Sequence, residues 1–103
     1  PAPSHRPESV ASLMRAELAR LLQQEVRDPR LGFVTVADVV MTADLRTARV
    51  YMSALGGEEA RRESFDALAR AKGFLRRELG RTLALRRVPE IIFVPAVEFP
   101  TIT

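Results

Sequence analysis

The chain has 103 residues, 47% hydrophobic and 6% aromatic, which is enough apolar material for one aliphatic core and too little for two. It has no cysteine and a single histidine, which argues against a disulfide-stapled secreted domain, a zinc module and a Cys–His or Ser–His nucleophile pair. The net charge is +3 and no apolar run approaches the roughly 18 residues of a membrane span, so we expect a cytoplasmic, metal-free domain.

The first elements in chain order are a lead-in and a helix. Residues 1–8 carry three prolines and no apolar run, which predicts a flexible lead-in rather than a secretory signal, with His5 solvated in it. Residues 10–26 place apolar side chains at the i, i+3, i+4, i+7 spacing of an amphipathic helix. Ser9 is its predicted N-cap, and the helix should stop before Pro29, because the residue before a proline avoids helical backbone.

Two segments rich in β-branched residues follow this helix. Residues 33–41 and 48–55 are predicted strands, and the short polar link 42–47 favours an antiparallel pair. A helix should begin near Glu58, and the apolar run 91–94 predicts a third strand. The chain therefore reads as an α+β domain.

The aromatic residues of the strands do not form an RNA-recognition platform. Phe33, Tyr51 and Phe93 fall one to a strand with no RNP-like sequence around them. We expect all three to pack in the core.

The region 58–85 could form one long helix or two. At about 100° per residue, one apolar arc of such a helix holds Phe65, Leu68, Leu75, Leu79 and Leu83. Lys72 would fall in the middle of this arc, and burying an unpaired ammonium is costly. Because Gly73 relaxes the backbone, we predict two helices joined by a kink at residues 71–73. A helix cap at Gly73, or a Lys72 that extends its ammonium to the rim, would also fit.

Basic residues concentrate in the same region. Residues 70–87 contain seven basic side chains against Glu78 alone, a local charge of +6, whereas the rest of the chain carries −3. Charge polarised in this way steers a polyanion to one place, and arginine suits phosphate oxygens and can stack on bases. The candidate RNA-binding residues are Arg70, Ala71, Lys72, Gly73, Arg76, Arg77, Arg81, Arg86 and Arg87.

Three of these arginines should form a ridge. Arg76, Arg77 and Arg81 fall opposite the leucine arc on the helical wheel. A solvated helix face is the alternative, but such a face normally mixes charges of both signs.

The inventory for catalysis is thin. No glycine-rich phosphate loop follows a strand, because Gly56-Gly57 lacks the required spacing. The carboxylates near residue 58 lack a histidine or further acidic ligands, and such a cluster is typical of a helix N-terminus. We expect no enzyme activity, no metal and no cofactor.

Several segments resemble the ribosome-binding factor A family of bacterial assembly factors. They lie in family order and spacing between residues 10 and 94, and the most specific are the Asp-Pro-Arg-Leu-Gly run at 28–32 and the Gly-Phe-Leu-Arg-Arg-Glu-Leu-Gly run at 73–80. The resemblance implies a type II KH-like fold over residues 9–95, with a three-stranded sheet packed against helices on one face. It also implies that residues 71–73 are the Ala-x-Gly kink that replaces the GxxG loop of ordinary KH domains.

The resemblance carries functional expectations as well. It implies a monomer that binds the immature small (30S) ribosomal subunit and its rRNA, supports late maturation of the 5′ end of 16S rRNA, and matters during growth in the cold. Ser9 stands where the family commonly has a basic residue, and the tail at 96–103 differs from the charged tail usual in the family. Two other functions stay open on the residues alone: a protein–protein adaptor that docks an acidic partner, and a nonspecific nucleic-acid-binding module.

Overall fold

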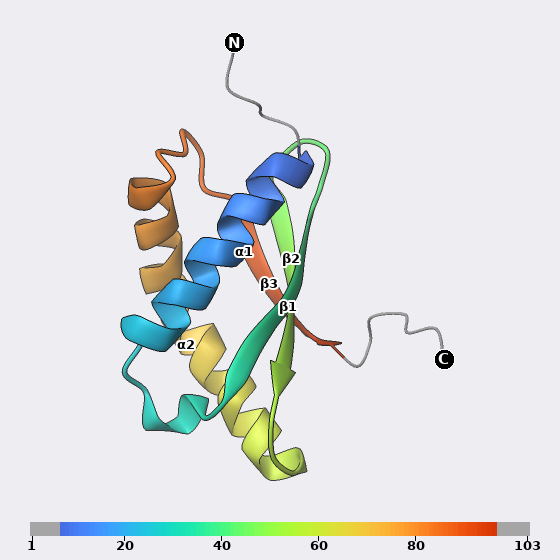
Figure 1. The fold of residues 1–103 in the computed structure, drawn as a ribbon, viewed down its shortest axis with the longest axis vertical. Coiled ribbons are helices and arrows are strands. Elements are labelled where there is room, and N and C mark those ends of the chain that lie inside the picture. The colour runs from blue at the N-terminus through green and yellow to red at the C-terminus, as the bar shows by residue number, and fades with distance from the viewer. Residues whose placement is uncertain (1–6, 97–103) are drawn as a thin grey trace, which may run out of the picture.

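The structure, a computed structural model, describes residues 7–96 and packs two long helices against one three-stranded sheet (Figure 1). In chain order the elements are α1 (Pro7–Gln24), the 3-10 turn η1 (Pro29–Leu31), β1 (Val34–Met41), β2 (Thr47–Ala54), α2 (Glu58–Thr82) and β3 (Glu90–Pro95). The predicted α+β class and its three-stranded sheet are confirmed. His5 and residues 97–103 lie outside the described residues.

Helix α1 begins earlier than predicted. Its first residue is Pro7, so Ser9 lies inside the helix and the prediction of Ser9 as N-cap is wrong. Proline fits the first helical turn because its φ is already helical and the missing N–H has no partner there in any case. Met14, Leu18 and Leu21 are fully buried and join α1 to the sheet.

The sheet has the order β1-β2-β3, with β2 at its centre. Strands β1 and β2 are antiparallel as predicted, and β3 runs parallel to β2. A bulge after Val36 shifts the register of β1, so the next buried residues are Val39 and Met41 instead of the even positions. Strand β2 alternates without interruption and buries Ala48, Val50 and Met52.

Helix α2 is one continuous helix from Glu58 to Thr82, so the prediction that a kink at residues 71–73 divides this region into two helices is wrong. The helix is nevertheless bent, because its axis changes direction between the yellow first half and the orange second half (Figure 1). Gly73 keeps a helical backbone, and Lys72 is only half-buried. The half-buried Lys72 fits the alternative in which a lysine of a continuous helix extends its ammonium to the rim.

The aromatic residues do not all serve the core. Phe93 is half-buried against it, but Phe33 is 80% exposed, so the expectation for Phe33 is wrong. Strand β1 begins at Val34, whose side chain packs against the core, and alternation turns its neighbour outward. Tyr51 lies half-buried on β2, with the Arg49 guanidinium 5.8 Å from its ring centre.

Candidate nucleic-acid interface

Arg70, the first residue of the basic stretch, pairs with a residue far away in sequence. Its guanidinium lies 3.0 Å from the carboxylate of Asp28, the residue that caps η1. The backbone N–H of Arg30 and the Arg70 side chain both donate to that carboxylate and lower the pKa of Asp28. The buried Ser64 hydroxyl also donates to the Leu31 carbonyl at 2.7 Å. Together these bonds fasten η1 to α2, so Arg70 has a structural task.

Arg76 is also committed to the fold. Its guanidinium donates to the carbonyl of Val88 at 3.0 Å and to that of Pro89 at 3.1 Å. Both carbonyls belong to the link between α2 and β3, where helix and strand geometry supply no partners for them. Arg76 therefore holds this link against the second half of α2.

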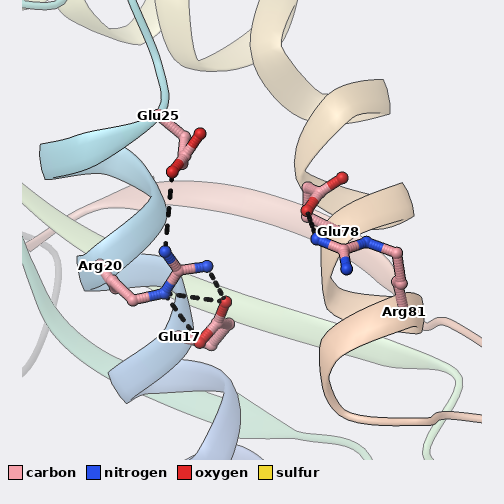
Figure 2. Close-up of polar contacts among 5 residues, drawn as sticks. All are labelled: Glu17, Arg20, Glu25, Glu78 and Arg81. Carbon is pink, nitrogen blue, oxygen red and sulfur yellow. Dashed lines mark hydrogen bonds and ion pairs between the residues drawn. The ribbon is translucent and has the colours of Figure 1, made fainter.

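Arg81 belongs to a surface of mixed charge between the two helices. Arg81 and Glu78 of α2 form an ion pair at 2.5 Å. Figure 2 shows this pair facing α1, which carries Glu17 and Arg20. Arg20 binds Glu17 and lies 3.8 Å from Glu25. The pKa of Glu17 is lowered mainly by its hydrogen bond from Arg20, and the pKa of Arg81 is raised by Glu78.

The predicted ridge of Arg76, Arg77 and Arg81 is therefore interrupted. Arg76 donates hydrogen bonds to backbone carbonyls, and Arg81 donates to the carboxylate of Glu78. Of the three, Arg77 alone keeps its guanidinium without a hydrogen bond or ion pair to any residue in the described range 7–96.

Four side chains of the basic stretch have no such partner within residues 7–96, and we call them the uncommitted cations: Lys72, Arg77, Arg86 and Arg87. Lys72 is half-buried and the three arginines are exposed. Arg77 lies along Gly73, where an added Cβ would come within 3.8 Å of its guanidinium. Ala71 packs partly against the core, so it has little surface to offer a ligand. The sequence treated all seven cations alike, and the fold divides them into two groups.

The fold also adds a cation that sequence reasoning missed. Arg46, on the link between β1 and β2, lines the same groove as Arg86 and Arg87, forty residues later in the chain. Only the parallel pairing of β2 with β3, which sets Thr47 beside Glu90, brings these two links together. No local pattern in the sequence could reveal this neighbourhood.

Two kinds of site are not found in the part of the chain that the structure describes. None of its helices is long and apolar enough to cross a membrane. No group of three or more histidine, cysteine, aspartate and glutamate side chains within residues 7–96 is arranged to hold a metal ion.

Comparisons with known proteins agree on one family. The family model described as ribosome-binding factor A matches residues 6–99. Ribosome-binding factor A of Desulfitobacterium hafniense is 45% identical over 89 residues, covering 86% of this chain and 71% of that protein. Its counterpart in Heliobacterium modesticaldum is 49% identical over 90 residues, covering 87% and 74%.

Solved structures give the same result. The crystal structure of ribosome-binding factor A from Thermus thermophilus has a TM-score of 0.78 at 30% identity, covering 90% of this chain and 99% of that one. A homology model of the Thermus thermophilus factor, as fitted into a cryo-EM map of a complex of the 30S subunit with that factor, has a TM-score of 0.63 at 34% identity, covering 85% and 97%.

Proposed function

Since its residues 6–99 match the family model, the chain belongs to the ribosome-binding factor A family, and from this premise we propose that it binds the free or immature small (30S) ribosomal subunit. Bound there, it supports late maturation of the 5′ end of 16S rRNA, and cells depend on it most in the cold. It acts in the cytoplasm as a monomer and needs neither a cofactor nor a chemical step of its own.

The observation that carries this proposal is the family match together with the set of uncommitted cations. A cation already paired with a carboxylate must lose that partner before it binds phosphate, which cancels part of the gain. Lys72 and Arg77 have no such partner among residues 7–96, so a phosphate group bound by them replaces only water. We therefore assign rRNA contact to the uncommitted cations and a supporting role to Arg70, Arg76 and Arg81.

Sedimentation with purified ribosomal subunits tests the proposal. The wild-type protein should co-sediment with small subunits, and more strongly with immature than with mature ones. The double variant Lys72→Glu/Arg77→Glu should lose most of this binding, because each reversal removes one phosphate contact and adds a repulsion. If the protein bound large subunits, or duplex DNA at the same concentration, as strongly as it binds small subunits, the proposal would be contradicted.

A matched control is available on the same helix. Arg61 and Arg62 are exposed residues of α2, where Arg61 donates to the Gly56 carbonyl and Arg62 pairs with Glu59. The variant Arg61→Glu/Arg62→Glu changes the net charge by the same amount at the other end of α2. It should keep most of its subunit binding. If both double variants lose binding equally, total charge rather than the uncommitted cations decides the affinity.

The maturation step needs a cellular readout. A bacterial strain without its own family member, supplied with this chain, should process the 5′ end of 16S rRNA at low temperature, as primer extension would show. The Lys72→Glu/Arg77→Glu variant should leave the precursor ends in place. Normal processing without any family member present would contradict the proposed role.

A further inference from the structure

Three segments that are distant in sequence enclose a groove at one end of the molecule. The start of α1, the β1–β2 link and the α2–β3 link all reach this end, at the top of Figure 1. The groove measures about 1010 Å³. Its lining combines aliphatic side chains, which we call the floor, with exposed arginines, which we call the rim. None of the contacts described above explains this combination.

The floor of the groove is aliphatic. It includes Leu13 of α1, Leu45 of the β1–β2 link, and Leu83 and Leu85 that follow α2. Leu13 is 57% exposed although it is a large hydrophobic residue of α1. The three other leucines are half-buried and pack on the core with part of their surface left open.

The rim carries three exposed arginines, Arg46, Arg86 and Arg87, and one carboxylate. None of the three guanidinium groups has a hydrogen bond or ion pair to a residue within the described part of the chain. The carboxylate of Asp44 accepts from the Thr42 hydroxyl at 2.7 Å and from the backbone N–H of Arg46 at 3.0 Å. These bonds and the charge of Arg46 lower its pKa, so its negative charge offsets one of the three positive charges. The rim therefore presents an excess of positive charge to whatever enters.

Both links that line the groove are closed by local backbone bonds. Within residues 7–96, Leu45 (φ 62°) and Ala84 (φ 52°) are the two non-glycine residues in the left-handed region, and both line this groove. Ala84 follows the C-cap of α2, where the Leu85 N–H donates to the Gly80 carbonyl, and Leu45 ends the β1–β2 turn, where its N–H donates to the Thr42 carbonyl. These bonds define the course of both links without a ligand.

We propose that this groove takes unpaired nucleotides of single-stranded RNA, with a base against the leucine floor and the flanking phosphates on the arginine rim. This inference rests on the proposed function and adds that the RNA bound at this site is unpaired. A duplex keeps its bases stacked inside and would reach the rim alone, whereas a single strand can turn a base toward Leu13. Charge complementarity with phosphate selects RNA over an apolar peptide.

The test compares two single strands of equal phosphate number by fluorescence anisotropy. They are an eight-nucleotide oligouridylate and an abasic ribose-phosphate chain of the same length. The wild-type protein should bind oligouridylate about five- to tenfold more tightly than the abasic chain, since the base adds apolar contact with the floor. Equal affinity for the two single strands would overturn the proposal.

Leu13→Ser removes apolar floor at an exposed helix position, where little stability is at risk. It should reduce oligouridylate binding to the level of the abasic chain and leave abasic binding unchanged. Leu55→Ser is the matched control, because Leu55 is 73% exposed and follows the far end of β2. An equal loss in both variants would overturn the proposal, and so would displacement of oligouridylate by an acidic leucine-containing peptide with higher affinity than the RNA.

The rim has its own signature. The Arg86→Gln/Arg87→Gln variant should weaken binding to oligouridylate and to the abasic chain alike, and the log–log salt slope should become shallower by about 1.4. If the small subunit does not bind but oligouridylate binding depends on Leu13, the proposed function fails and the groove assignment stands. If subunit binding is intact and Leu13→Ser changes nothing, the groove assignment alone fails.

Discussion

Replacing Arg76 by alanine should destabilise the fold, whereas the same change at its neighbour Arg77 should not. Arg76 donates to the Val88 carbonyl at 3.0 Å and to the Pro89 carbonyl at 3.1 Å, and Pro89 is buried. A hydrogen bond from a charged donor contributes about 1.5–3 kcal/mol when it is shielded from water. Because the bond to Val88 is exposed, we expect a total loss of about 2 kcal/mol for Arg76→Ala.

Arg77→Ala controls for helix propensity and for net charge, since both residues are exposed positions of α2. Arg77 has no partner to lose within residues 7–96, so its variant should unfold within about 0.5 kcal/mol of the wild type. Urea unfolding followed by circular dichroism at 222 nm measures both, and Arg76→Ala should lower the midpoint by about 1–2 M at an unchanged slope. Equal midpoints for the two variants would refute the division into committed and uncommitted cations.

Three further predictions concern the fold that carries these side chains. Gly73→Ala should stabilise the folded protein by about 0.5–1 kcal/mol through helix propensity. Gly80→Ala should destabilise it in the same urea assay, because the new Cβ would lie 2.7 Å from a methyl of the stiff Val88 side chain. A Gly80→Ala variant as stable as the wild type would contradict this packing. The pKa of Asp28 is lowered in the fold, so its contribution to stability is present above the unfolded pKa and is lost as pH falls through the folded pKa. The difference in unfolding free energy between the wild type and Asp28→Asn should therefore close below about pH 4. A difference that persists at pH 2 would contradict this. Ser64→Ala removes a buried hydrogen bond to the η1 turn and should cost about 1–2 kcal/mol by thermal unfolding, and an unchanged melting temperature would contradict this.

Local sequence patterns were sufficient for the elements and for the class of the fold. Hydrophobic spacing located α1 and the helical region of α2, which it divided in two, and the β-branched runs located all three strands to within a residue at each end. The errors arose where local rules allow more than one outcome. Pro7 starts a helix as readily as it precedes one, and Lys72 avoids burial through its long stem instead of through a helix break.

The site was predictable only as a concentration of charge. Whether an arginine is free depends on what the fold brings to it, and the partner of Arg70 stands 42 residues away. The partners of Arg76 are backbone carbonyls, which every residue carries and no sequence pattern distinguishes. Tertiary contacts therefore divide the basic stretch, and the same contacts bring Arg46 to the groove.

The salt dependence of small-subunit binding tests the central claim most directly, namely that the uncommitted cations contact rRNA. The dissociation constant would be measured across a range of salt concentrations for the wild type and for a variant with Lys72, Arg77, Arg86 and Arg87 all replaced by glutamine. Each lost phosphate contact makes the log–log slope shallower by about 0.7–0.9, so the account predicts a total change near 3. An unchanged slope, with the variant still folded and bound, would contradict it.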